Sequence, residues 1–222
     1  MTGQAADQFF YGKHRLEIVG IKGTSLTTAK DFGIELASAS TGCWRGYIMR
    51  YKIIEKKLVI DGFWVNTRSK KEMPEINGIL PTQDHEIRSL FKYEYRNLNL
   101  KVPFNGSIWL GKDFINSQYV HMGFQSPTAY RTVLKLDLKD GIIVNVEDKS
   151  NEIEKAREDG DPKGYRPDSM SSETIHDWVM RRFSLNLPSK EEKPESLHNS
   201  IDKVKQEMLE ELDRLNKLKD KE

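Results

Sequence analysis

The residues with the widest chemical range stand close together at 41 to 47, where the chain reads Thr-Gly-Cys-Trp-Arg-Gly-Tyr. The segment combines a thiol (Cys43), an indole (Trp44), a guanidinium (Arg45) and a phenol (Tyr47). A positive charge beside a thiol favours the thiolate, which is the nucleophilic form of cysteine. The same guanidinium can bind a carboxylate or a phosphate through two parallel hydrogen bonds. The segment therefore predicts a reactive cysteine or a site for a small anionic ligand.

A structural interpretation of this segment is favoured over the functional one. In a strand, alternate side chains share a face, so Cys43, Arg45 and Tyr47 would point the same way. A lone cysteine is usually buried and then acts as a small apolar side chain. Arg45 would in that case pair with a buried acidic group inside the core.

The second segment of interest lies at 119 to 123 and reads Tyr-Val-His-Met-Gly. Tyr119 and His121 are at alternate positions, and a histidine can act as a base or as a ligand near neutral pH. If this segment lies beside Cys43, a Cys–His pair for nucleophilic catalysis is formed. Otherwise His121 is a histidine that is hydrogen-bonded within the sheet. The candidate catalytic residues are Cys43 and His121, and the candidate ligand-binding residues are Arg45, Tyr47, Tyr119 and His121.

Stronger catalytic or metal signatures are absent from the sequence. There is no phosphate-binding Gly-rich loop that ends in Lys-Ser or Lys-Thr, no dinucleotide fingerprint and no Gly-x-Ser-x-Gly elbow. The five histidines do not show the spacing of a metal site, and one cysteine excludes an all-thiolate centre within a single chain. Asp159 and Asp161 lack the later carboxylates of a calcium loop. We therefore expect neither a metal nor a cofactor.

The two segments together resemble paired motifs, T-x-C-W-R-G-Y and Y-V-H-M-G, in a family of uncharacterised bacterial proteins. The resemblance covers roughly residues 40 to 147. Gly42 replaces the expected small residue such as alanine, and residues 124–126 depart slightly from the usual continuation. The resemblance implies a bacterial cytoplasmic origin, but it implies no activity, ligand or catalytic residue.

The elements that must position these residues are mostly strands. Alternating side chains predict a hairpin of 43–54 with 58–65. A second hairpin joins 130–138 to 142–146 through Asp140-Gly141, a strong turn signal. Shorter strands are predicted at 15–21, 32–36, 90–100, 107–110 and 118–122. We expect a mainly β fold over residues 8–148, arranged as an antiparallel β sandwich or a partly open barrel.

The remainder of the chain is polar and helical. Residues 149–170 read as a polar linker, and 171–222 as a helical C-terminal extension with a short helix and a long one. The long helix, at 196–219, carries an apolar stripe on an otherwise charged surface. The stripe predicts an interface with a protein partner or a second copy, or a helix that folds back onto the β domain. Its main residues are Ile201, Val204, Met208, Leu212 and Leu215.

The composition limits the partners that we expect. The 222 residues include 35 Lys and Arg against 34 Asp and Glu, which gives a net charge of +1. This charge does not favour a nucleic acid as the partner. Lys70-Lys71 and Arg181-Arg182 could still form a local basic patch. No apolar run is long enough to span a membrane. The first residues lack a cationic start followed by an apolar run, so we expect a cytoplasmic protein.

Two classes of function follow from these observations. The first is a non-enzymatic cytoplasmic binding or adaptor protein, with the helix at 196–219 for self-association as a homo-oligomer or for docking. The alternative is a small-molecule or nucleotide-processing enzyme, or a binder of a small anionic ligand, that uses the region of Cys43, Arg45 and His121.

Overall fold

The structure is a computed structural model that describes residues 2–158 and 169–187. In these residues the chain forms nine strands, two α-helices and three short 3-10 helices, so the predicted mainly β fold is confirmed. The strands are β1 (Gln8–Tyr11), β2 (His14–Gly23), β3 (Tyr47–Ile54), β4 (Lys57–Val65), β5 (Tyr93–Tyr95), β6 (Leu100–Lys101), β7 (Gly106–Phe114), β8 (Tyr130–Lys139) and β9 (Ile142–Asp148). The helices are α1 (Ser150–Glu158), α2 (Ser172–Arg182), η1 (Ala29–Phe32), η2 (Asn116–Gln118) and η3 (Pro127–Ala129).

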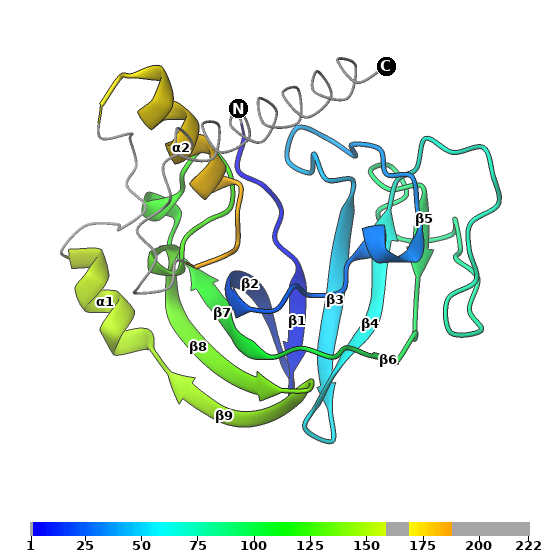
Figure 1. Ribbon diagram of the computed structural model, residues 1–222, viewed down its shortest axis with the longest axis horizontal. Helices are drawn as coiled ribbons and strands as arrows, with labels where there is room; N and C mark the ends of the chain where they lie inside the picture. The colour runs from blue at the N-terminus through cyan, green and yellow to red at the C-terminus, as the bar shows by residue number, and fades with distance from the viewer. Residues whose placement is uncertain (1, 159–168, 188–222) are drawn as a thin grey trace, which may run out of the picture.

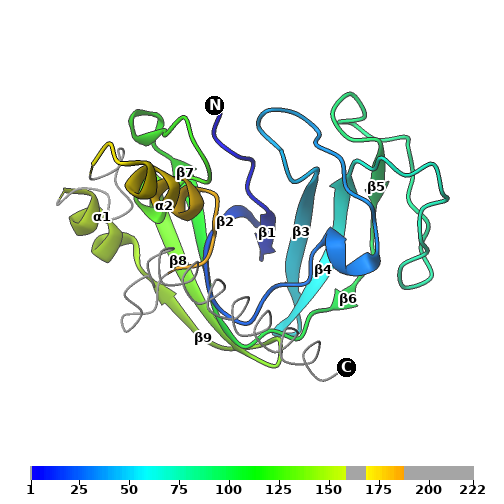
Figure 2. The same ribbon diagram turned by 45° about the horizontal axis from the view of Figure 1, so that its top comes forward.

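All nine strands belong to one sheet that closes into an uneven ring (Figures 1 and 2). The order is β3-β1-β2-β7-β8-β9-β4-β5, with β6 paired to β4 outside this sequence, and the β3–β4 hairpin completes the ring. The sheet is mixed because β1 runs parallel to β3, whereas the other pairs are antiparallel. The ring is uneven because β9 and β4 pair only at Ile142 and Lys57. Of the two expected arrangements, the partly open barrel describes it better.

The main core fills the inside of the ring. Alternate residues of each strand point inward, as the side-chain period of two requires. On β3 these are Tyr47, Met49 and Tyr51, all buried, as the alternation in the sequence predicts. Phe9 of β1 and Phe63 of β4 are fully buried in the same cluster. The inner faces of β1 and β3 therefore define one wall of the interior.

Helix α1 covers part of the outer surface of the ring. Its Ile153 joins a second apolar cluster with Val19 and Val133. Arg157 donates to the carbonyl oxygens of Thr128 and Tyr130, both at 2.7 Å. The helix belongs to the segment predicted as a polar linker, so that prediction is wrong for 150–158. Ile153 and Arg157, together with Ser150, which accepts from the N–H of Val133 at 3.1 Å, therefore hold this mostly polar helix against the ring.

Helix α2 lies where a short helix is predicted. Ser171 caps it by accepting a hydrogen bond from the backbone N–H of Thr174. The segment that follows the helix, orange in Figure 1, returns to β2, where Ile21 donates to the carbonyl of Leu185 and accepts from the N–H of Leu187. The predicted helix at 196–219, with Ile201, Val204, Met208, Leu212 and Leu215, lies outside the described residues.

Several predicted strand positions differ from the structure. Residues 118–122 form the end of η2 and an irregular segment. Residues 32–36 contain the last residue of η1 and the chain after it, where Gly33 adopts a left-handed conformation (φ 71°). Cys43 forms only an isolated bridge with Ser40, and residues 44–46 form a turn and a bend, so β3 begins only at Tyr47. Residues 90–100 contain only short strands. Strand β1 has no counterpart among the predicted strands.

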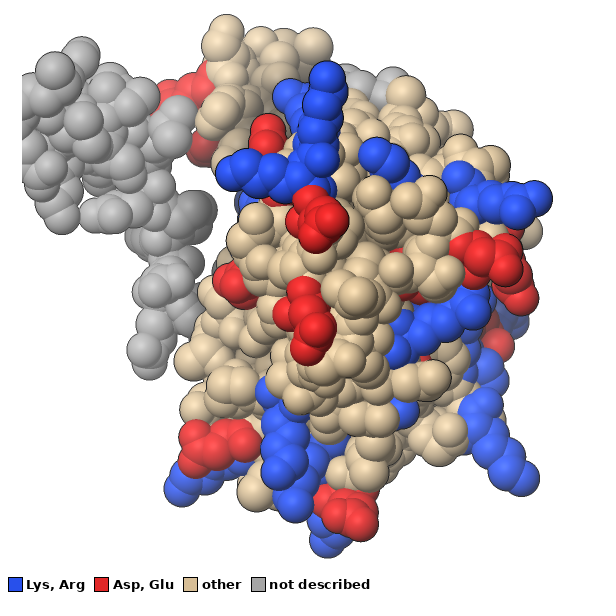
Figure 3. Space-filling view, turned by 90° about the vertical axis from the view of Figure 1, so that its right-hand side faces the viewer, with Lys and Arg blue, Asp and Glu red and all other residues tan. Residues whose placement is uncertain are grey.

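The surface carries both signs of charge. On the face that includes β4, β5 and the long loop between them, Lys and Arg are interspersed with Asp and Glu (Figure 3). In the described part of the chain, neither α1 nor α2 has the length and apolar character of a membrane span.

Candidate functional site

The segment Gly3–Asp7 joins the two sequence motifs. The backbone N–H of Gln4 donates to the carbonyl of Gly123 in the second motif, at 2.7 Å. The next N–H, of Ala5, donates to the carbonyl of Gly42 in the first motif, at 2.8 Å. The Gln4 side-chain oxygen also accepts from the backbone N–H of Trp44, at 3.0 Å. Segments that are far apart in the sequence therefore meet on the N-terminal segment.

Arg45 forms a largely buried ion pair with Asp7, in which 18% of the Arg45 side chain and 6% of the Asp7 side chain are exposed. The two guanidinium nitrogens donate to the two carboxylate oxygens at 2.8 and 2.7 Å, and a third bond of 3.1 Å reaches the carbonyl of Ala5. Asp7 is only 4% exposed and also accepts from the N–H of Met49. Burial alone would lower the pKa of Arg45, but the charge of Asp7, its hydrogen bonds and the weaker effects of Tyr47 and Cys43 together raise the pKa above its ordinary value. This is the structural interpretation of the first motif, with Asp7 as the acidic partner.

Aromatic rings surround this ion pair. The Arg45 guanidinium carbon lies 4.8 Å from the ring centroid of Tyr47 and 5.4 Å from that of Phe124. Burial raises the pKa of the Tyr47 hydroxyl, which keeps that side chain neutral. The pair is therefore held in an environment of low polarity.

Cys43 has the features of a structural cysteine. Its side chain is buried, and its sulfur lies 3.4 Å from the carbonyl oxygen of Tyr47 as a weak donor. Burial raises the pKa of the thiol, and the opposing effect of Arg45 is smaller. The thiolate expected from a neighbouring guanidinium is thus not favoured, because desolvation disfavours the charged form.

His121 lies apart from the thiol. It is exposed, and its ring meets the ring of Tyr119 edge-on, with 4.8 Å between centroids. The Tyr119 hydroxyl accepts from the N–H of Gly3, at 3.1 Å. The hydrogen bond of the Cys43 sulfur goes to Tyr47, so the contacts of the described residues bring no Cys–His pair together.

Two motif glycines have steric roles. Gly46 has a φ of 78°, and a Cβ built there would lie 1.9 Å from the carbonyl oxygen of Ala37. Gly123 has a φ of 70°, and its Cβ would lie 2.1 Å from the carbonyl oxygen of Arg182. A side chain is excluded at both positions, so these glycines allow close packing of backbone on backbone.

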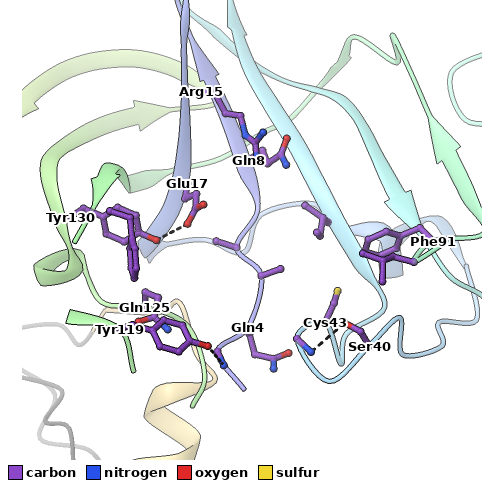
Figure 4. A pocket seen from close by; sticks show the side chains of 17 residues that line it. Gln4, Gln8, Arg15, Glu17, Ser40, Cys43, Phe91, Tyr119, Gln125 and Tyr130 are labelled. Carbon is purple, nitrogen blue, oxygen red and sulfur yellow. Dashed lines mark hydrogen bonds between the residues drawn. The ribbon is translucent and has the colours of Figure 1, made fainter. Parts of the chain in front are cut away.

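Two cavities lie on opposite sides of the N-terminal segment. The first, which we call the inner cavity, has a volume of about 520 Å³ and opens from the inside of the ring. The second, the outer cavity, has a volume of about 460 Å³ and lies over the outer face of β1 and β2 (Figure 4). Gln4 lines both of them. The side chains of this extended segment alternate between the two cavities, because Asp7 and Phe9 face inward while Gln8 faces outward.

The inner cavity is lined by aromatic side chains and by one ion pair whose two charges cancel. Among its described lining residues, Asp7 and Arg45 are the only charged ones, and they bind each other. Five aromatic side chains also line it: Trp44, Tyr47, Tyr51, Phe124 and Phe183. The Trp44 ring stacks on Phe183 with 5.1 Å between centroids. The end of helix α2 therefore supplies part of the wall.

The predicted site residues are divided between these cavities. Arg45 and Tyr47 line the inner cavity, and Cys43 and Tyr119 line the outer one. His121 lines neither of the two. In the ranges that the structure describes, no group of three or more His, Cys, Asp or Glu side chains is placed to hold a metal ion.

Sequence reasoning missed the N-terminal contribution to the site. Asp7 and Gln4 precede a strand of only four residues, so they carry little periodic signal. The alternation of Asp7, Phe9 and Tyr11 with Gln8 and Phe10 is the one available sign of β1. The sequence predicts a buried acidic partner for Arg45, but it offers many carboxylates and no rule to select Asp7.

The chain was also compared with known proteins. No protein-family model matches it, and neither a curated protein nor a solved structure matches. The function must therefore be argued from the geometry of the two cavities.

Proposed function

We propose that this protein is a non-enzymatic binding protein that holds a small, uncharged, ring-containing ligand in the inner cavity. The observation that carries the proposal is the Asp7–Arg45 pair, which brings no net charge to a cavity lined by five aromatic side chains. The volume of about 520 Å³ is within the range of small-molecule sites.

An uncharged ligand fits the cavity better than an anion. Asp7 already accepts from two nitrogens of Arg45, so an anion would have to displace a buried carboxylate. Removing one partner of a buried ion pair typically costs about 3–5 kcal/mol, which a weak anionic ligand does not recover. The small anionic ligand expected from the sequence is thus the less supported alternative.

Polar groups at the rim can orient such a ligand. Ser25 and Asn186 line the cavity, and Ser25 is exposed. A flat ring can stack on Trp44 or Tyr47 while its polar edge bonds to these side chains.

Binding without turnover is supported by the state of the candidate nucleophile. Cys43 is buried with a raised pKa, and no histidine is among the described residues that line either cavity. An enzyme that uses Cys43 and His121 would need a thiolate and a nearby base. The enzymatic alternative therefore has less support than binding.

The adaptor part of the proposal rests on the sequence. The apolar stripe of 196–219 supports self-association or docking on a protein partner, inside a bacterial cytoplasm as the family resemblance implies. The mixed charges of Figure 3 and the net charge of +1 give no support to a nucleic-acid partner.

Fluorescence of Trp44 tests the ligand class. The full-length protein is titrated with uncharged ring compounds and with their carboxylate analogues, such as nicotinamide with nicotinate and benzamide with benzoate. We expect saturable quenching by members of the uncharged set, weaker quenching by their analogues, and loss of the signal in Trp44→Phe. Stronger quenching by the carboxylates would contradict the proposal.

A further inference from the structure

The outer cavity carries two opposite charges that do not pair with each other. Among its described lining residues, Arg15 and Glu17 are the only charged ones. They are alternate residues of β2, so they share the outer face with their Cβ atoms about 7 Å apart. Neither forms an ion pair within the described residues, in contrast to Asp7 and Arg45 in the inner cavity.

The hydrogen bonds leave both groups with free capacity. Glu17 accepts from the Tyr130 hydroxyl through one oxygen, and its other oxygen has no partner in the described part of the chain. Arg15 has an exposed guanidinium that makes no hydrogen bond to another described residue. Gln8 lies directly opposite Glu17 in the β1–β2 register, and its amide is also free within the described ranges. The floor of the cavity thus presents a cationic donor, an anionic acceptor and an amide (Figure 4).

Tyr130 fixes the position of the acidic group. The Tyr130 ring is buried, with only 2% of the residue exposed, and burial and the charge of Glu17 both raise the pKa of its hydroxyl. The hydroxyl therefore stays protonated and remains a donor to Glu17 across the ordinary pH range. Such a bond holds the carboxylate in place on the cavity floor.

The walls of the outer cavity are apolar. Ile48, Leu90, Phe91 and Phe114 contribute to the lining. Phe91 lies on the side away from Tyr130 (Figure 4), whereas Phe114 packs edge-on against Tyr130, with 5.3 Å between the ring centroids. Leu90 is 48% exposed and Phe114 is 38% exposed, so part of this apolar surface is open to a ligand. The volume of about 460 Å³ is in the range of small-molecule sites.

We propose that the outer cavity binds a small zwitterion with an apolar side chain, such as a free apolar amino acid. Its carboxylate binds Arg15, its ammonium binds Glu17, and its side chain packs on an apolar wall of the cavity. An anion alone would be repelled by Glu17 and a cation alone by Arg15, whereas a ligand with both charges satisfies both groups. This site is separate from the inner cavity and does not depend on its ligand.

Calorimetry with L-leucine and L-phenylalanine tests this proposal on the full-length protein. Leucinamide, which lacks the carboxylate, and N-acetyl-leucine, which lacks the ammonium, are the matched ligands. We expect the amino acids to bind and each analogue to bind about ten- to a hundredfold more weakly, as expected for the loss of one charge-assisted contact. No measurable binding of either amino acid, or equal binding of the analogues, would overturn the proposal.

Variants locate the binding on the protein. Arg15→Gln and Glu17→Gln are expected to weaken amino-acid binding by about ten- to a hundredfold, and the amide oxygen that Glu17→Gln retains can still accept from Tyr130. Lys13→Gln removes the same charge as Arg15→Gln from an exposed turn residue that does not line the cavity, so it should bind as the wild type does. Ser25→Trp, which places a large side chain at the rim of the inner cavity, should also leave this binding unchanged. Equal affinity in Arg15→Gln and Lys13→Gln would contradict the assigned site.

Discussion

At the residue scale, the most informative contact is the ion pair between Arg45 and Asp7. In the sequence, Arg45 alternates with Cys43 and Tyr47, and an arginine on such a face predicts a partner of opposite charge. The structure supplies that partner from the N-terminal segment, whose sequence carries little periodic signal. The pair is buried, and Asp7 also holds the backbone of Met49 through a 2.7 Å hydrogen bond.

We predict that Asp7→Ala destabilises the fold by about 3–5 kcal/mol, because Arg45 is then buried without a counter-charge. Denaturant unfolding measures the change. Replacing both residues with apolar ones, as in Asp7→Leu with Arg45→Met, should recover most of the loss. A single variant as stable as the wild type would show that the pair contributes little.

The thiol of Cys43 gives a second prediction at this scale. Because burial raises its pKa, little thiolate exists near neutral pH, and alkylation of the native protein should be at least about 100-fold slower than that of the unfolded chain. The rate should rise as the pH approaches and passes 9.0, the ordinary value for the group. Iodoacetamide labelling followed by mass spectrometry measures this. Fast labelling at neutral pH that is lost in Arg45→Ala would instead favour the enzymatic alternative.

At the element scale, the hairpins were predictable and the irregular segments were not. The alternation of Tyr47, Met49 and Tyr51 and the Asp140-Gly141 turn determine local geometry, and the structure has hairpins at both places. Residues 118–122 resemble a strand in sequence, but the chain just after them bonds to the end of α2 and to the N-terminal segment instead. That outcome depends on tertiary contacts, such as the bond from the Phe124 N–H to the carbonyl of Arg182, which no local pattern reports.

The close packing of α2 on this loop leads to a prediction about Gly123. Gly12→Ala and Gly123→Ala both place a side chain at positive φ, but nothing lies within 4 Å of the Cβ at Gly12. We expect about 1 kcal/mol of destabilisation at Gly12 and roughly 1–3 kcal/mol more at Gly123, where the Cβ meets the carbonyl of Arg182. Thermal unfolding compares the two. Equal destabilisation by Gly12→Ala and Gly123→Ala would show that α2 can move away from the new side chain at position 123 without a loss of stability.

At the scale of the whole molecule, the ring and the C-terminal extension have different roles in our account. We propose that the ring binds a ligand in its inner cavity and that the apolar stripe predicted at 196–219 provides an interface with another chain. The alternation of side chains predicted a mainly β body and a partly open barrel as one of two arrangements, but it did not predict that β1 inserts in parallel beside β3.

Deleting residues 196–222 tests the interface. If the stripe mediates self-association, the deletion should reduce the oligomeric mass measured by light scattering to that of one chain. An unchanged oligomeric state would contradict self-association through this segment, and a monomeric full-length protein would do the same.

The most direct test of the central claim is native mass spectrometry of the full-length protein as purified, beside Ser25→Trp and Ser89→Trp. Ser25 is an exposed residue that lines the inner cavity, whereas Ser89 is exposed and lines neither cavity. We predict a reproducible small, uncharged adduct on the wild type and on Ser89→Trp, and none on Ser25→Trp. A wild-type protein without an adduct that also binds none of the uncharged ring compounds, or an adduct unaffected by Ser25→Trp, would contradict the claim.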